Sequence, residues 1–259
     1  MASHNEMQAN RFEYKYIISE RCARTLRDFA RPYLVPDEHA DPNYNYSYAI
    51  HSVYLDGPGL PLYYGTVRGV KNRYKMRIRY YDDRPENPVF FEIKRRVTDV
   101  ILKSRAMIKR IAVSRLLQGY WPEPSDLVKP GDQKSMDVLN RFWELHNQIH
   151  ARGRCIVSYL REAWVHPESN SVRMTFDRNL VAARFEGELR VGDFLGGVRP
   201  YIPGVVLELK FTDRFPHWMS DMVRVFGLQR GSMAKYVTCI DALHPREQKL
   251  NVGVLEGAV

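Results

Sequence analysis

Cysteine and long apolar runs are what this 259-residue sequence has least of. Its three cysteines, Cys22, Cys155 and Cys239, form neither a CxxC pair nor a Cys/His cluster with zinc spacing. We therefore expect free thiols in a reducing compartment. No apolar run is long enough to cross a membrane, and the polar residues 1–10 lack the core of a signal peptide. These absences predict a soluble, cytoplasmic protein.

Acidic residues are scarce in one segment of the chain. Between Arg68 and Arg110 there are fourteen Lys and Arg against five Asp and Glu, so this segment carries as much net charge as the whole chain, +9. Such a concentration of positive charge predicts an anionic partner. At this length we expect one domain over 1–245, with a helical insertion at about 111–150, and a loosely structured tail at 246–259.

The strongest single signal is the stretch 73–81. If it is a strand, alternate residues point to opposite faces, and one face is a row of cations about 7 Å apart: Arg73, Lys75, Arg77 and Arg79. Like charges side by side repel, so a row of one sign favours a ligand with several negative charges in a line, such as a phosphate chain. For one strand alone, a solvated charged face is the simpler interpretation.

The same pattern recurs along the chain, which argues against that simpler interpretation. Five predicted strands place Lys, Arg or Glu on one face and apolar or aromatic residues on the other: 11–18, 73–80, 89–96, 154–164 and 205–211. In a closed barrel either face can point inward, so these charged faces could line a tunnel. Arg binds phosphate oxygens bidentately, Lys adds point charge, and Glu can hold a divalent cation that bridges phosphate oxygens.

Aromatic residues are expected opposite the cations, on the apolar faces of these strands. Single-stranded nucleic-acid binders mix aromatic and basic side chains on one exposed platform, so we expect no nucleic-acid partner. Outside the charged strands, Ser19 is predicted to cap a helix that ends near Ala30, and a further helix opens at Pro216. A strand is also expected over 171–178.

Several short motifs, taken in order, resemble one known family. They are Arg11-x-Glu13-x-Lys15-Tyr16, Ser52-Val53-Tyr54-Leu55-Asp56, the row at 73–81, Glu92-Ile93-Lys94, Tyr159-x-Arg161, Val172-Arg173-x-Thr175-Phe176-Asp177, Glu208-Leu209-Lys210-Phe211 and Lys235-Tyr236. Over roughly residues 10–243 the sequence resembles the VTC domain, the polyphosphate-polymerase domain of the vacuolar transporter chaperone complex and its bacterial relatives. That domain is similar to the CYTH proteins and other triphosphate tunnel metalloenzymes. The resemblance implies an α+β fold, with an antiparallel β barrel that forms a charged tunnel and has peripheral helices.

The resemblance also implies roles for individual side chains. Catalytic roles are implied for Arg77, Arg79, Lys94, Arg161 and Arg173, and phosphate binding for Lys15, Arg68, Arg73, Lys75, Lys103, Arg105, Lys210 and Lys235. Glu208 is implied as the ligand of Mn²⁺ or Mg²⁺, with Glu92 and Glu13 as weaker candidates. The wider CYTH pattern opens with two alternating Glu, whereas Arg11 takes the first position here, which favours the polymerase branch.

The implied activity is that of a metal-dependent polymerase that transfers the γ-phosphoryl group of ATP onto inorganic polyphosphate. The sequence lacks a Walker-type glycine loop, so charged side chains would have to position the phosphates. The alternatives are a triphosphate hydrolase or nucleotide cyclase of the same fold and a non-catalytic polyphosphate sensor. If the product is exported, a separate membrane protein is needed as partner, which would place the protein peripherally at a membrane. The sequence does not indicate an oligomeric state.

Overall fold

The computed structural model describes residues 11–98, 100–169, 171–191 and 196–244, so the expected tail at 246–259 lies outside the described residues. Its strands are β1 (Arg11–Ile18), β2 (Val35–Pro36), β3 (Ser47–Asp56), β4 (Arg73–Tyr80), β5 (Val89–Val97), β6 (Val100–Ile108), β7 (Arg152–Val165), β8 (Val172–Arg184) and β9 (Val205–Thr212). Its helices are α1 (Glu20–Ala30), α2 (Pro61–Val67), α3 (Val113–Leu117), α4 (Gln133–Gln148), α6 (His217–Val225) and α7 (Lys235–Leu243).

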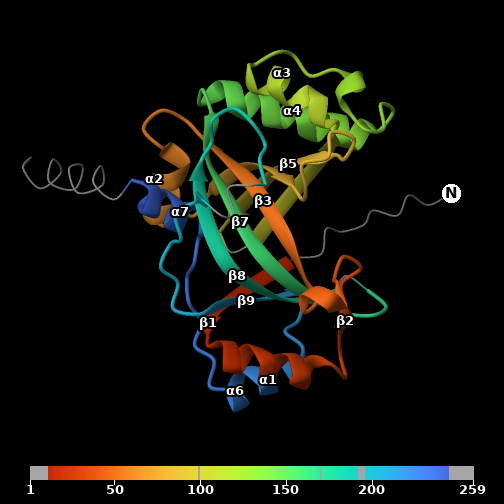
Figure 1. Ribbon diagram of the computed structural model, residues 1–259, viewed down its shortest axis with the longest axis vertical. Helices are drawn as coiled ribbons and strands as arrows, with labels where there is room; N and C mark the ends of the chain where they lie inside the picture. Colours follow the sequence, from red (N-terminus) through yellow and green to blue (C-terminus); the bar gives the residue numbers. More distant parts are fainter. Residues whose placement is uncertain (1–10, 99, 170, 192–195, 245–259) are drawn as a thin grey trace, which may run out of the picture.

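All nine strands belong to one antiparallel sheet. Its order is β1-β9-β8-β7-β3-β4-β5-β6, and the short β2 pairs with β7 (Figure 1). The sheet curls until Cα atoms of its two edge strands, β1 and β6, lie within 8 Å of each other. Over the described residues these edges share no backbone ladder, so the barrel is open along one seam. The predicted antiparallel β barrel with peripheral helices is confirmed, and the seam is the difference from a closed one.

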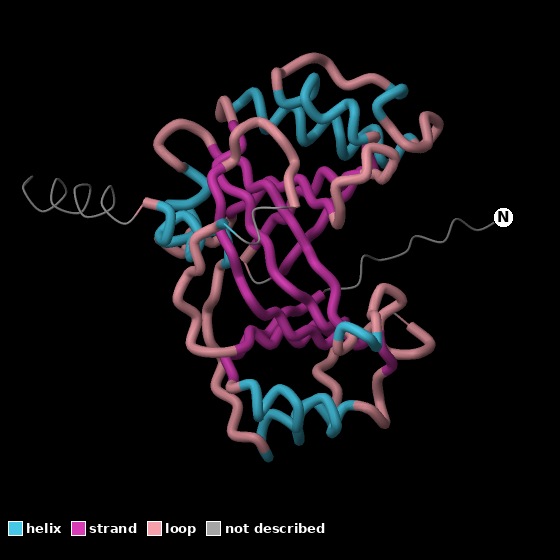
Figure 2. The backbone as a smooth tube through the Cα atoms, in the orientation of Figure 1, coloured by secondary structure: helices cyan, strands magenta, loops and turns pink. Residues whose placement is uncertain are grey.

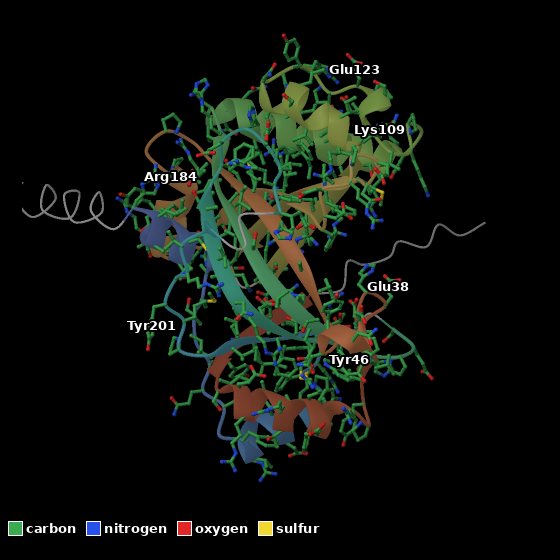
Figure 3. The ribbon with its side chains drawn as sticks, viewed as in Figure 1. Glu38, Tyr46, Lys109, Glu123, Arg184 and Tyr201 are labelled. Atoms are coloured by element: carbon green, nitrogen blue, oxygen red, sulfur yellow. The ribbon has the colours of Figure 1, made fainter. Side chains whose placement is uncertain are left out.

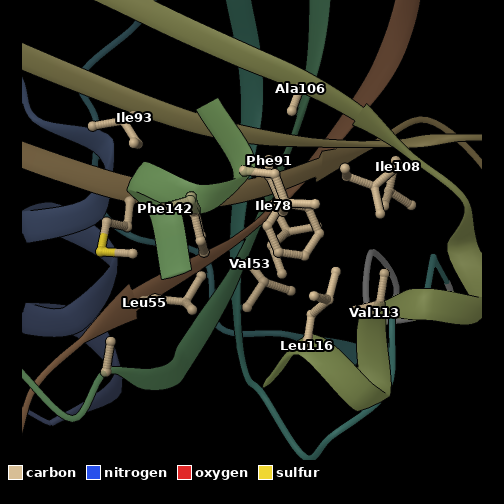
Figure 4. Packing of buried hydrophobic residues seen from close by; sticks show 14 of the residues in the cluster. Val53, Leu55, Ile78, Phe91, Ile93, Ala106, Ile108, Val113, Leu116 and Phe142 are labelled. Atoms are coloured by element: carbon tan, nitrogen blue, oxygen red, sulfur yellow. The ribbon is translucent and has the colours of Figure 1, made fainter. Parts of the chain in front are cut away.

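Helices cover the convex face of the sheet in two groups. Figure 2 shows α1 and α6 below the strands, and α3 and α4 above them. The upper helices pack on apolar side chains of β3, β4, β5 and β6, including Ile78, Phe91 and Ile108, each at most 2% exposed (Figure 4). The rings of Phe91 and Phe142, on β5 and α4, meet edge to face with centroids 4.7 Å apart. Because these strands bury their apolar side chains outward, their charged side chains point into the concave face.

The predicted elements mostly form where expected. The hydroxyl of Ser19 accepts a hydrogen bond from the backbone N–H of Cys22 (3.1 Å), which confirms it as the cap of α1. The strand expected over 171–178 is longer, because β8 continues to Arg184. The chain passes Asn179 with φ of 53°, beside a register shift between β7 and β8. This bulge breaks the alternation on which the prediction relied.

Helix α7 packs inside the curl, on inward-facing side chains of β7 and β8. The fully buried carboxylate of Asp56 accepts hydrogen bonds from the backbone N–H groups of Leu62 (3.0 Å) and Tyr63 (2.9 Å) in α2 and from the hydroxyl of Tyr236 in α7 (2.8 Å). One carboxylate therefore ties two helices to the end of β3. It also fixes Lys235, which directly precedes Tyr236. Across the described residues, none of the helices has the length and apolar character to cross a membrane.

Candidate functional site

The concave face of the curled sheet encloses a cavity of about 580 Å³. All four cations of the β4 row line it: Arg73, Lys75, Arg77 and Arg79. Ten further residues that the sequence analysis had singled out also line it: Glu13, Lys15, Lys94, Lys103, Arg105, Arg161, Arg173, Glu208, Lys210 and Lys235. The structure thus brings together side chains from eight elements, β1 and β4 to β9 together with α7.

Two predicted site residues lie elsewhere. Arg68 follows the last turn of α2, is exposed, and places its guanidinium over the ring of Tyr64, 5.5 Å from the centroid, so it does not line the cavity. Glu92 has a fully buried side chain and is not among the residues that line the cavity. Its oxygens accept from Arg77 Nε (2.6 Å) and Arg105 Nε (2.7 Å), and Lys103 Nζ lies 2.8 Å away. Because Glu92 is not among the residues that line the cavity, the metal-ligand role considered for it stays a prediction.

Glu208 is the most heavily shared carboxylate of the cavity. Lys210 Nζ (2.6 Å) and Arg161 Nη2 (3.3 Å) lie beside one of its oxygens, and Lys235 Nζ (2.9 Å) and Lys15 Nζ (3.6 Å) lie beside the other. Burial alone would raise the pKa of Glu208, but these four cations hold it well below its usual value. Glu208 is therefore an anion that fixes four phosphate-binding candidates at once.

Asp177 extends this network. It accepts two hydrogen bonds from Arg161, from Nε and Nη2, both at 2.7 Å, and Lys235 Nζ lies 2.6 Å away. Although burial alone would lower the pKa of Lys235, Asp177 and Glu208 raise it, so this lysine stays charged. Glu13 forms an ion pair across the open seam with Lys94 Nζ at 2.9 Å, and another on its own strand with Lys15 Nζ at 3.1 Å. Side chains thereby join β1 to β5 where the backbone does not.

Cross-strand register places like charges opposite one another on the wall formed by β4, β5 and β6. The opposed pairs are Arg73 with Arg96, Lys75 with Lys94, and Lys94 with Lys103. Like charges directly opposite in a sheet destabilise it. Of the residues that the structure describes, no carboxylate forms an ion pair with Lys75, and burial together with the neighbouring cations lowers its pKa to about 7. A bound polyanion would relieve this repulsion.

Aromatic rings share the cavity with the cations, so the expectation that they lie on opposite faces is wrong for Tyr48, Tyr54 and Tyr81, whereas the alternation along 154–164 already places Tyr159 on one face with Arg161. The hydroxyl of Tyr54 accepts from Arg77 Nη1 (3.1 Å). A sequence signal also existed for Tyr81, because it stands two residues after Arg79, on the same face. Asp37 was also missed; it pairs with Arg173 Nη2 at 2.5 Å.

The side chains that could coordinate a metal ion decide what kind of metal site could form in the cavity. The described part of the chain holds no group of three His, Cys, Asp or Glu side chains that could enclose a metal. Glu208 and Glu13, both ionised and both beside Lys15 Nζ, remain as oxygen donors. Mg²⁺ is usually held by one or two carboxylates plus substrate phosphates rather than by an all-protein cage. The residues therefore fit a Mg²⁺ or Mn²⁺ ion that enters together with a phosphate chain.

Comparisons with known proteins agree with this geometry. The model of the VTC domain family matches residues 10–244. Subunit 4 of the vacuolar transporter chaperone complex of Schizosaccharomyces pombe is 24% identical over 207 residues, which is 68% of this chain and 29% of that protein. This chain thus spans less than a third of the length of the curated relative it matches.

Two solved structures have related shapes. A Bacillus halodurans protein provisionally named an adenylate cyclase is 12% identical, with a TM-score of 0.49 over 87% of this chain and 94% of that one. HpAC1 of Hippeastrum, described with a dominant triphosphatase activity, is 12% identical, with a TM-score of 0.49 over 90% and 96% of the two chains. Both scores lie below 0.5, so the fold assignment rests on the sheet itself.

The depressed pKa of Lys75 predicts that anion binding takes up protons. At about pH 8 most of this lysine is neutral in the free protein, because its pKa is about 7, and a bound polyanion raises that pKa by favouring the ammonium form. Affinity for inorganic tripolyphosphate should therefore fall as the pH rises above about 7. Calorimetry in buffers of different ionisation enthalpy should show proton uptake, and less of it for Lys75→Met.

Proton uptake by Lys75→Met should be smaller than in wild type but not zero, because the pKa of Lys210 is also lowered, to about 8, by burial and by Arg161. Lys129→Met, a change of an exposed lysine outside the cavity, is the matched control and should behave as wild type. Equal proton uptake by wild type and Lys75→Met would show that Lys75 does not meet the anion.

Proposed function

This chain belongs to the VTC domain family, and from that premise we propose that it is a metal-dependent polyphosphate polymerase. It transfers the γ-phosphoryl group of ATP onto a growing polyphosphate chain inside the basic cavity. The proposal is supported by the family match over 10–244 and by the similarity to a subunit of the vacuolar transporter chaperone complex. It is supported equally by the chemistry of the cavity, which suits a linear anion with many charges.

The observation that carries the proposal is the like-charge register of β4, β5 and β6. A triphosphate could be met by the cations near Arg77 and Arg79 alone. The row continues for two more positions along β4, to Lys75 and Arg73, each about 7 Å from the next, and each faces another cation across the sheet. Cations beyond the reach of one triphosphate are useful if a longer chain lies in the same cavity.

Phosphoryl transfer needs positioning and charge neutralisation more than a covalent nucleophile. In the proposed reaction a terminal oxygen of the polyphosphate chain attacks the γ-phosphorus of ATP, a new P–O bond forms, and the bond to the β-phosphate oxygen breaks to release ADP. Arg77 and Arg79 neutralise the transferred group. Arg161 and Lys235, held by Asp177 and Glu208, bind the phosphates on the opposite wall.

A divalent cation would complete this set of charges. Glu208, with Glu13 beside it, would hold Mg²⁺ or Mn²⁺. When bound, the ion supplies Lewis-acid charge to phosphate oxygens. Because both carboxylates already neutralise lysines, metal and phosphate would bind more tightly together than separately, each supplying charge that the other needs.

A membrane-associated partner is part of the proposal, because the relative belongs by name to a transporter chaperone complex. We propose that a separate membrane protein receives the polyphosphate, which would place this chain at the membrane surface. A pull-down from membranes that recovers no such protein would count against this arrangement.

Incubating the purified protein with ATP and Mn²⁺ tests the activity, with a gel for polyphosphate and an assay for free phosphate. Long chains should form, and Arg77→Ala should lower kcat at least about 100-fold, as loss of a transition-state donor typically does. Arg224→Ala is the matched control: this arginine on α6 has a side chain 77% exposed, pairs with Asp221, and does not line the cavity.

The products separate the competing activities. Free phosphate without chains would replace the polymerase with a triphosphate hydrolase. Neither product, together with tight polyphosphate binding, would indicate a sensor of phosphate chains. Chains formed at the wild-type rate by Arg77→Ala would contradict the role of the β4 row.

A further inference from the structure

Four aromatic side chains gather at one end of the basic cavity: His39, Tyr48 and Tyr81 line it, and Phe90 packs edge to face on Tyr81. We call them the aromatic mouth. Ring centroids lie 5.8 Å apart for His39 and Tyr48, 6.3 Å for His39 and Tyr81, 6.5 Å for Tyr48 and Tyr81, and 5.9 Å for Tyr81 and Phe90. They come from the loop after β2, the start of β3, the residue after β4 and the start of β5.

These rings lie at the margin of the apolar core, against which Tyr48 and Tyr81 pack. Tyr80 is fully buried, whereas its neighbour Tyr81, like Tyr48, is only half-buried and lines the cavity. His39 lines it as well, with a side chain 61% exposed. The interplanar angles within the mouth range from 39° to 77°, so no two of its rings are stacked in parallel. The guanidinium of Arg105 lies over the ring of Phe90, 4.2 Å from its centroid, so a planar ligand would stack on the rings that line the cavity, those of His39, Tyr48 and Tyr81.

The mouth adjoins the cations that would meet a triphosphate. Tyr81 follows Arg79 on the same side of the chain, about 7 Å along it. Tyr48 lies directly opposite Arg161 in the pairing of β3 with β7. The hydroxyl of Tyr48 accepts a hydrogen bond from Arg173 Nη2 (3.2 Å), so a phosphate-binding candidate also holds this ring in place.

Charge distinguishes the two ends of the β4 row. Two carboxylates, Asp37 and Glu38, line the cavity at the aromatic mouth. Asp37 is paired with Arg173, so Glu38, with a side chain 86% exposed, is the carboxylate that would repel the end of a bare phosphate chain and tolerate an uncharged group. At the opposite end of the row Arg73 faces Arg96.

From this asymmetry we propose that the aromatic mouth binds the nucleobase of the nucleoside triphosphate donor. The phosphates of the donor then run along β4 from Arg79 towards Arg73, and the polyphosphate chain occupies the end away from the mouth. The inference rests on the proposed function in taking ATP as the donor, and it adds where the base lies and which way the chain points.

Comparing ATP with inorganic tripolyphosphate isolates the base, because both ligands carry a triphosphate. Calorimetric Kd values should show that Tyr81→Ala weakens ATP binding roughly five- to thirty-fold, the usual range for loss of one base–aromatic stack. Tripolyphosphate should bind this variant and wild type alike. Tyr81→Phe, which keeps the ring, should retain the ATP affinity of wild type.

The control is Tyr201→Ala, since Tyr201 is 87% exposed and lies on the opposite side of the molecule from Glu38 (Figure 3). Equal weakening of both ligands by Tyr81→Ala, or of neither, would overturn the base subsite. So would wild-type protein that binds ATP no more tightly than tripolyphosphate. These readouts do not depend on chain synthesis, so a protein that makes no polyphosphate could still show the base subsite. Wild type that binds neither ligand would overturn both proposals.

Discussion

Repulsion between like charges on one concave face is the constraint on which the rest of this structure depends. A curled sheet that turns a row of cations inward must hold them at short distances in a partly dry space, where charge interactions are strong. The carboxylates offset this repulsion because each of them pairs with more than one cation. Glu208, Glu92, Asp177 and Glu13 each contact at least two cations, and Glu208 contacts four. Replacing Glu92 would leave Arg77, Lys103 and Arg105 without a carboxylate partner among the described side chains.

After these ion pairs are formed, positive charge remains in excess on one wall of the cavity, and that excess points to function. The carboxylates neutralise the wall formed by β1, β8, β9 and α7 more completely than the wall formed by β4, β5 and β6, where Lys75 has no anionic partner among the described side chains. Phosphate would therefore add the charge that the second wall lacks while it meets fixed donors on the first. Preorganised donors of this kind cost little reorganisation when charge develops in a transition state. The outward-facing apolar residues of the same strands, packed under α3 and α4, keep these donors in place.

The features of the fold and of the candidate site that follow from local side-chain patterns could be predicted from the sequence. Alternation along β4 placed four cations on one face, and the cap at Ser19 marked the start of α1. Which cation meets which carboxylate could not be predicted, because those pairs join residues far apart in sequence: Lys235 with Asp177, Arg161 with Glu208. Glu92 has the same alternation as Lys94, and only the register with Arg77 and Arg105 shows it enclosed. The sequence did not assign the rings on β3 to a side, because neither face of that strand carries a row of charges and the pattern does not say which face is concave.

A crystal structure of the protein with tripolyphosphate and Mn²⁺ tests the central claim most directly. The account predicts phosphate density along β4 between Arg79 and Arg73, with an anomalous manganese peak beside Glu208. Phosphate bound only on the convex surface, for example over the exposed Lys129 and Lys134, with the cavity cations still paired as they are here, would contradict it.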